Sequence, residues 1–188
     1  HAVAVFHLQD AQLAMRSLSQ ARRLFRQEGS LPWEATCEFY KAAFLLDAGQ
    51  VDAARDSAIS AVTHLDRTPL LTKSIPALLL LSRIESSAGR IEEARRYLDR
   101  AQRKGSASNT LPMRFQLAIC EGRLCDAEAD SQGAWNAYLQ ARDILETIRG
   151  QFGGDGLRIS FVADKLHCYA RLVSLAIARA VPCSLPQV

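Results

Sequence analysis

Two stretches of the chain that repeat one pattern decide the fold. Residues 42–54 read AAFLLDAGQVDAA, and residues 82–94 read SRIESSAGRIEEA. When the whole chain is shifted so that residue 42 falls on residue 82, two columns hold only alanine: Ala14, Ala54, Ala94 and Ala134, and seven positions later Ala21, Ala61, Ala101 and Ala141. A fixed period of this kind, here about 40 residues, is typical of repeat proteins.

The columns around the alanines predict a packed pair of helices in each repeat. Between the two alanine columns lie Leu18, Ala58, Leu98 and Tyr138, which share a helical face with them. Twelve positions before the first alanine column the side chains are all small: Ala2, Ala42, Ser82 and Gly122. Small side chains let two helices approach closely, so this position predicts the crossing of the pair.

Turn and breaker residues divide the chain into units. Five positions before the first alanine column lie Gln9, Gly49, Gly89 and Ala129, and the two glycines there suit a left-handed residue after a helix. Glycine and proline also recur between repeats, at 29–32, 68–69, 75–76, 105–112 and 150–156. They predict units of about 1–30, 33–68, 74–105 and 111–150, with an unpaired helix at 157–179. No run alternates as a strand does, so we expect an all-α fold, a single right-handed α-solenoid over residues 1–188.

Helix pairs with small residues at the crossing and a Gly-Gln or Gly-Arg turn resemble tetratricopeptide (TPR) repeats. The resemblance covers almost the whole chain, although the period is longer than the usual one of about 34 residues. It implies a superhelix whose concave surface, lined by the first helix of each pair, binds a protein or peptide.

Composition excludes several other functions. The chain is 48% hydrophobic, has a net charge of +3 and is only 7% aromatic, so it lacks the basic, aromatic stripe expected of a nucleic-acid-binding protein. It has no apolar run long enough to cross a membrane. Its five cysteines include no C-x-x-C pair, which predicts buried, reduced thiols in a cytoplasmic protein.

No set of residues predicts catalysis, a metal or a cofactor. The segment 150–156 is rich in glycine but lacks the Gly-Lys-Ser/Thr ending of a phosphate-binding loop. His167 and Cys168 are adjacent, so their side chains point about 100° apart on a helix. Cys120 and Cys125 have no nearby histidine. We therefore expect a non-catalytic protein.

The period also predicts which side chains line the concave groove. Arg83 and Arg123 occupy the same position in consecutive units, and together they could hold a carboxylate of an acidic peptide. The ordinary alternative, which we favour, is that Arg83 pairs with Asp47 and Arg123 with Asp126. The full set of groove candidates is Phe39, Asp47, Arg83, Ser86, Arg123, Asp126 and His167. Arg22, Arg23 and Arg26 form a further basic cluster that could contact an acidic partner, although a solvated face is the simpler interpretation.

The C-terminal third resembles a more specific group. Residues 134–149 end in a Leu-Glu-x-x-Arg helix, and residues 158–173 contain Arg-x-Ser-Phe-x-x-Asp-Lys followed by Tyr-x-x-Leu-Val. This pattern is similar to the last TPR units upstream of a bacterial CHAT domain, which is a caspase-like protease domain. The resemblance implies a sensor or docking region that controls a downstream CHAT domain of the same parent chain. The alternative is the TPR sensor region of a signal-responsive ATPase or transcriptional activator. Exposed array ends also make a homo-oligomer plausible.

Overall fold

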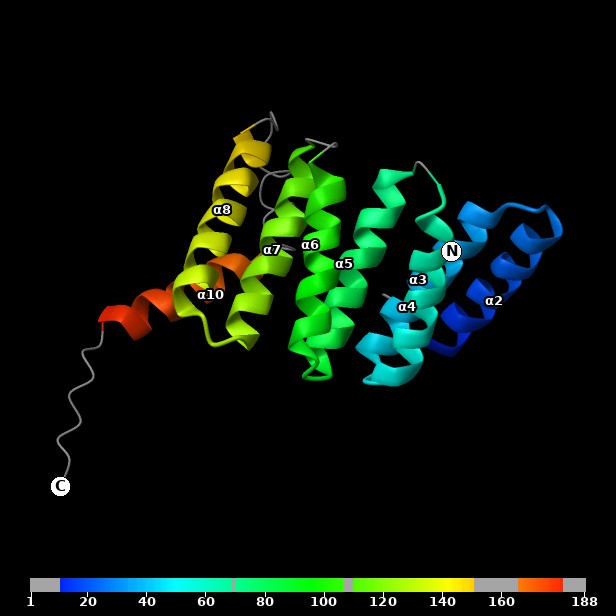
Figure 1. Ribbon diagram of the computed structural model, residues 1–188, viewed down its shortest axis with the longest axis horizontal. Helices are drawn as coiled ribbons and strands as arrows, with labels where there is room; N and C mark the ends of the chain where they lie inside the picture. Colours follow the sequence, from blue (N-terminus) through cyan, green and yellow to red (C-terminus); the bar gives the residue numbers. More distant parts are fainter. Residues whose placement is uncertain (1–10, 69, 107–109, 151–165, 181–188) are drawn as a thin grey trace, which may run out of the picture. The chain divides into compact units, whose positions relative to one another are not determined.

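The computed structural model describes residues 11–68, 70–106, 110–150 and 166–180 of the chain. These residues form helices joined by short turns, with no strand among them, which confirms the all-α class for this part of the chain (Figure 1). The helices are α2 (Ala11–Gln27), α3 (Leu31–Asp47), α4 (Val51–Leu65), α5 (Leu71–Ser87), α6 (Ile91–Gly105), α7 (Leu111–Ala127), α8 (Ser131–Gly150) and α10 (Leu166–Ala180). None of the helices so described is both long and apolar enough to span a membrane.

The helices belong to two compact units. The first lies within residues 1–108, where α2 packs on α3, α3 packs on α4 and α5, α4 also packs on α5, and α5 packs on α6. The second lies within residues 109–188, where α8 packs on both α7 and α10. The pairs α3/α4, α5/α6 and α7/α8 are antiparallel hairpins (Figure 1).

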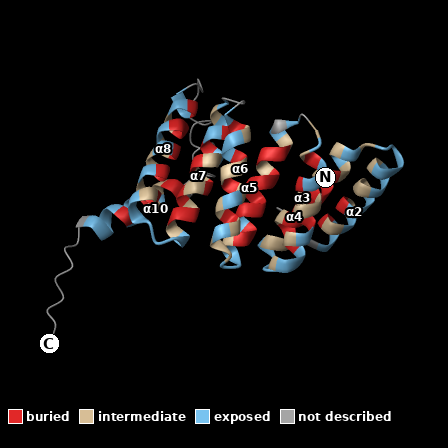
Figure 2. Cartoon of the chain, viewed as in Figure 1, coloured by how far each residue is buried: buried red, intermediate tan, exposed pale blue. Residues whose placement is uncertain are grey.

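The core of each unit contains the alanine columns found in the sequence. Seven of the eight alanines are completely buried, and Ala21 is half-buried. Leu18, Ala58, Leu98 and Tyr138 are also buried, so the buried side of each second helix carries these columns (Figure 2).

The small residues at the predicted crossing lie where two helices of a hairpin meet. The Ser82 hydroxyl on α5 donates a 2.8 Å hydrogen bond to the Ala94 carbonyl on α6. At the same place in the second unit, a Cβ added to Gly122 would lie 2.8 Å from the ring of Tyr138 on α8. Close helix approach at these positions therefore depends on a small residue in the first helix.

The turn inside each hairpin has a left-handed residue. Gly49 and Gly89 both have a φ of +74°, which confirms the prediction for these two glycines. Ala129 takes the same place between α7 and α8 with a φ of +59°, although it carries a Cβ that disfavours this conformation.

The described helix bounds differ from the predicted units at α5. This helix begins at Leu71, before the expected start at residue 74, and Pro76 lies inside it. Proline fits helical φ and removes one backbone donor, a loss that the long apolar run after Pro76 offsets by burial. The helical parts expected in residues 1–10 and 157–165 lie outside the described residues.

A fully buried carboxylate joins three segments of the first unit. Arg55 on α4 donates from Nε to Glu85 Oε1 at 2.7 Å, and Arg90 in the turn after α5 donates to the other oxygen, Oε2. The hydrogen bond to Glu85 raises the pKa of Arg55. Because Glu85 is completely buried, this pair of bonds compensates a charge that would otherwise be costly.

Candidate functional site

The groove candidates in the first unit lie on α3 and α5. Phe39 is half-buried and packs edge-on against Tyr40, with ring centroids 5.1 Å apart. Asp47 is the exposed last residue of α3, Arg83 is exposed on α5, and Ser86 is half-buried one turn later. The structure gives no ion pair between Asp47 and another described residue, so the predicted pair with Arg83 is not formed there.

In the second unit, Asp126 makes a different contact from the predicted ion pair with Arg123. Asp126 on α7 accepts hydrogen bonds from Arg171 on α10, at 2.7 and 3.0 Å, and from the Tyr138 hydroxyl at 2.8 Å. Burial and the bond to Asp126 raise the pKa of Tyr138, against the charges of Arg171 and Arg123. Asp126 is thus bonded to Arg171, which was not among the predicted groove residues. His167 lies on α10, and its side chain is outside the described residues.

Arg83 and Arg123 belong to different units. Each is described within its own unit, Arg83 on α5 and Arg123 half-buried on α7. The joint anion site expected from their common phase therefore stays a prediction.

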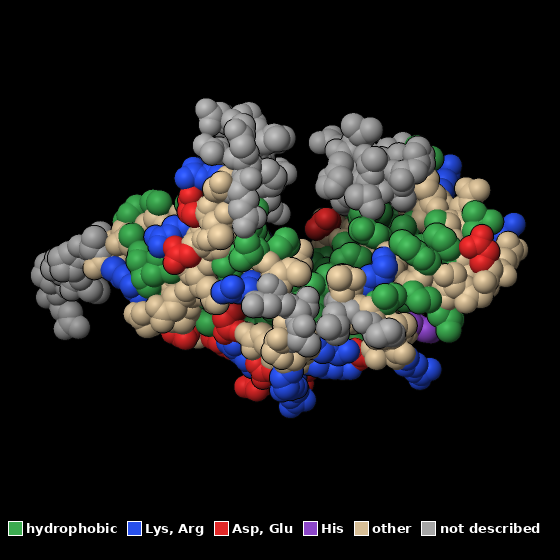
Figure 3. Space-filling view, turned by 90° about the horizontal axis from the view of Figure 1, so that it is seen from above, with side chains coloured by type: hydrophobic (Ala, Val, Ile, Leu, Met, Phe, Trp, Pro, Cys, Tyr) green, Lys and Arg blue, Asp and Glu red, His purple; other side chains and the backbone are tan. Residues whose placement is uncertain are grey.

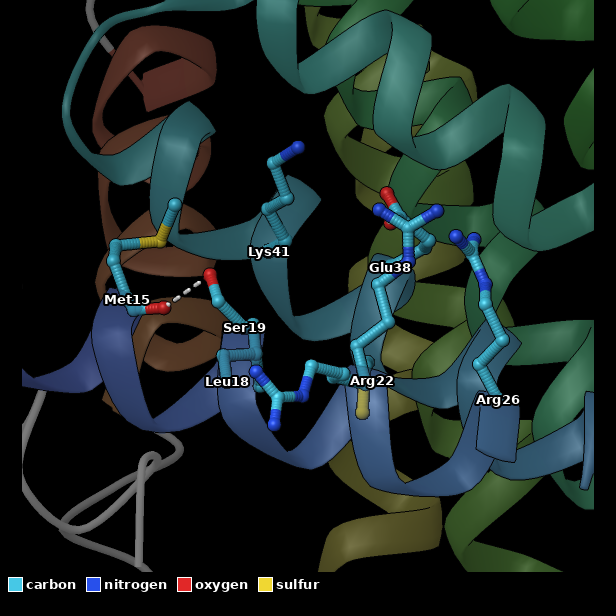
Figure 4. Close-up of a pocket in the computed structure, with 9 residues that line it drawn as sticks. Met15, Leu18, Ser19, Arg22, Arg26, Glu38 and Lys41 are labelled. Carbon is cyan, nitrogen blue, oxygen red and sulfur yellow. Dashed lines mark hydrogen bonds and ion pairs between the residues drawn. The ribbon is translucent and has the colours of Figure 1, made fainter. Parts of the chain in front are cut away.

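A cavity of about 230 Å³ lies between α2 and α3 in the first unit. Its α2 wall contains Met15, Leu18, Ser19 and three arginines, and its α3 wall contains Cys37, Glu38 and Lys41. Figure 4 shows Arg22 and Arg26 reaching from α2 toward Glu38 on α3. We call this set the α2–α3 cleft.

Two arginines of the cleft are tied to glutamates of the facing helix. Arg26 donates from Nε to Glu34 Oε1 at 2.8 Å, and Arg22 lies 3.4 Å from the same oxygen. The hydrogen bond from Arg26 lowers the pKa of Glu34, and the same bond raises the pKa of Arg26. Arg22 Nη1 also lies 2.5 Å from Glu38 Oε1. These contacts fix α2 against α3.

Three charged side chains of the cleft can still interact with a ligand. Glu38 is only 5% exposed, and its Oε1 forms an ion pair with Arg22 Nη1 but no hydrogen bond with a described residue. Arg23 is exposed and Lys41 is half-buried, and neither makes an ion pair within the described part of the chain. The cleft therefore presents two available cations beside one buried acceptor.

The cysteines do not give this cleft a nucleophile. Burial raises the pKa of the Cys37 thiol, and the same cause raises that of Cys168, so both favour the protonated thiol over the nucleophilic thiolate. Cys120 and Cys125 are also buried and form no disulfide with a described residue, as the sequence predicts, and Cys183 lies outside the described residues. The chemistry that the cleft offers is recognition of charge.

Aromatic side chains lie in the last turn of α2 and the first turn of α3. Trp33 at the start of α3 is 49% exposed, stacks on Phe25 of α2 at 5.8 Å, and lies beneath Lys73 Nζ at 4.0 Å. Figure 3 shows hydrophobic side chains gathered on the face of the first unit that is turned to the viewer. Trp33 thus joins three helices of the unit while half of its surface is exposed.

The arginine cluster was visible in the sequence, but its partners Glu34 and Glu38 were not predicted. Arg22 and Arg26 are four positions apart on α2, and Glu34 and Glu38 have the same spacing on α3. Two complementary pairs on consecutive helices are a signal for contact between facing sides, which was available in the sequence. Lys41 carries no such signal, because only the packing of α2 on α3 brings it to the cleft.

No protein-family model matches the chain. The comparison with curated proteins likewise finds no significant match.

Proposed function

We propose that the protein is a non-catalytic binding scaffold of TPR-like repeats, a right-handed α-solenoid with a period of about 40 residues. One observation carries the proposal. The first helices of three successive hairpins begin at Leu31, Leu71 and Leu111, and their second helices begin at Val51, Ile91 and Ser131, so the hairpins start at equal intervals along the chain. A unit repeated in this way buries its apolar face only by stacking on neighbours, and the surfaces left over serve for binding.

The recurring contacts inside the hairpins support the same proposal. The left-handed turn residue, the buried alanines and the small residue at the crossing recur at equal positions. The partner in this proposal is a protein or peptide held on the first helices. The parent would be a cytoplasmic bacterial protein in which the array docks or senses a signal and controls a downstream CHAT domain.

The alternative parent is a signal-responsive ATPase or transcriptional activator with a TPR sensor region. The reading frame beyond Val188 separates the two. A caspase-like domain with a catalytic histidine and cysteine supports the first parent, and a DNA-binding helix-turn-helix supports the second.

Site-specific photocrosslinking in cells tests the scaffold function itself. A photoreactive amino acid is placed at Phe39 or Ser86 on first helices, and at the exposed Thr63 or Gln102 on second helices as controls. A defined crosslinked partner at the first-helix positions, and none at the controls, is the expected result. Equal crosslinking at all four positions, or turnover by the purified chain in a hydrolase screen, contradicts the proposal.

A further inference from the structure

The α2–α3 cleft has charges where the next pair of packed helices has a hydrophobic core. One repeat period after Arg22, Glu38 and Lys41 lie Val62, Leu78 and Leu81, which are 5%, 0% and 1% exposed. The same backbone positions can therefore be filled by apolar side chains, so packing alone does not call for an arginine, a glutamate and a lysine here. An unusual cluster of charge in a cavity is the kind of feature that ligand binding explains.

The charges of the cleft favour an anionic ligand. Arg22, Arg23, Arg26 and Lys41 contribute cations, and the facing Glu34 and Glu38 compensate Arg26 and Arg22. Arg23 and Lys41 remain without a counter-ion among the described residues. A carboxylate is well matched to an arginine, whose guanidinium can donate two parallel hydrogen bonds.

The buried oxygen of Glu38 restricts which anion fits. Oε1 is ion-paired with Arg22 Nη1 at 2.5 Å but accepts no hydrogen bond from a described residue, so a ligand that brings a hydrogen-bond donor suits this oxygen better than one that brings only acceptors. Inorganic phosphate at neutral pH offers mainly acceptors and is repelled by this carboxylate. A peptide offers both groups in one molecule, since its acidic side chain is an acceptor and its backbone N–H is a donor.

We propose that the α2–α3 cleft binds an acidic peptide segment, with Arg23 and Lys41 contacting its carboxylates and Glu38 accepting a backbone N–H. The inference rests on the proposed function, and it assigns the chemistry of the partner and one of its contact sites, formed by the first helix α3 and the preceding helix α2. The carboxylate-binding site proposed here lies between the facing sides of α2 and α3, whereas the sequence predicted one at Arg83 and Arg123.

Fluorescence anisotropy of a labelled hexaglutamate peptide with the full chain tests this inference. The variant R23Q/K41Q should bind the peptide about 10-fold more weakly or worse, since each lost charge contact of this kind is worth a factor of about five or more. The matched control is R16Q/R67Q, which removes the same charge at exposed positions outside the cleft and should retain wild-type affinity. Circular dichroism should show both variants folded, because neither Arg23 nor Lys41 joins an ion pair within the described residues.

Three results overturn the inference. The first is an equal loss of affinity in both variants, which means attraction to net charge alone. The second is binding of inorganic phosphate to the cleft as tight as that of the peptide. The third is no peptide binding by the wild-type chain. If photocrosslinking at Phe39 or Ser86 still captures a partner in that case, the proposed scaffold function stands and only the assignment of the cleft fails.

Discussion

At the scale of single residues, Gly122 shows how one missing side chain sets the distance between two helices. Its hydrogen faces the ring of Tyr138, and a Cβ there would lie 2.8 Å from two ring atoms. The ring cannot move away easily, because Tyr138 is completely buried and its hydroxyl is bonded to Asp126. The contact between α7 and α8 is therefore built around glycine.

We predict that G122A lowers the free energy of unfolding by about 1–3 kcal/mol, the usual cost of overpacking a core. Urea unfolding followed by circular dichroism measures the change. The control is G150A, where an added Cβ meets nothing within 4 Å; it should stay within about 0.5 kcal/mol of the wild type or gain slightly. Equal stability of G122A and the wild type would show that α7 and α8 are farther apart than described.

The raised pKa of the Tyr169 hydroxyl leads us to predict that the protein loses stability at alkaline pH. Burial, followed by its 2.5 Å hydrogen bond to Glu146, raises the pKa of Tyr169 to about 12 from the ordinary value of 10.0. A group whose pKa is higher in the folded state stabilises the fold below the unfolded pKa, and this contribution is lost as pH rises through the folded pKa. The unfolding free energy should therefore fall between about pH 10 and pH 12.

The variant Y169F isolates this contribution. It should be about 1 kcal/mol less stable at neutral pH, because the bond to Glu146 is lost, and its stability should decline less steeply over the alkaline range. Tyrosinate absorbance gives an independent readout, since one fewer late-ionising tyrosine should be seen. An unchanged alkaline slope in Y169F would contradict the role given to this phenol.

At the scale of elements, we predict opposite effects on stability for substitutions at Gly89 and Ala129, which occupy the same position in the turns of two hairpins. Gly89 has a φ of +74° and open space around its Cα, so G89A costs only backbone strain, about 1 kcal/mol. Ala129 already bears that strain at a φ of +59°. A129G should therefore stabilise the protein by about 0.5 kcal/mol, after the greater freedom of glycine in the unfolded chain is subtracted. Thermal and urea unfolding of both variants check the two signs, and destabilisation by A129G would contradict the left-handed turn.

The buried carboxylate of Glu85 joins α4, α5 and the turn before α6. E85Q should destabilise the first unit by about 2 kcal/mol, somewhat less than a fully buried pair costs, because both arginines reach solvent. The exposed Glu92 provides the control, and E92Q should change stability by no more than about 0.5 kcal/mol. Chemical unfolding of the two variants compares them directly, and equal effects would mean that Glu85 is not the buried link described.

The buried helix faces and the turns could be predicted from the sequence where they depend only on residues that are close together in the chain. Alanine columns, Gly49 and Gly89 predicted buried faces and turns because helix periodicity and positive φ are properties of a few neighbouring residues. The start of α5 was missed, since the burial of the apolar run after Pro76 outweighs the local cost of proline. The partner of Asp126 was missed for a similar reason: Arg171 is distant in the chain and meets Asp126 only through packing of the second unit.

At the scale of the whole molecule, the proposed binding depends on the α2–α3 cleft, which the sequence indicated only through the cluster Arg22, Arg23 and Arg26. The chain has a modest net charge of +3, so a general attraction to anions is weak, and a local site must supply specificity. The first unit contains such a site in the α2–α3 cleft. The repeat period predicted a binding scaffold, whereas the place of binding depends on how α2 and α3 bring their charges together.

The most direct test of this account is a backbone NMR titration of the full chain with the hexaglutamate peptide. Shift changes should concentrate on α2 and α3, around Arg23, Glu38 and Lys41, while α7 and α8 remain unchanged. Changes centred on another helix, such as α6, or spread evenly over exposed arginines, would contradict the assignment of the α2–α3 cleft as the binding site.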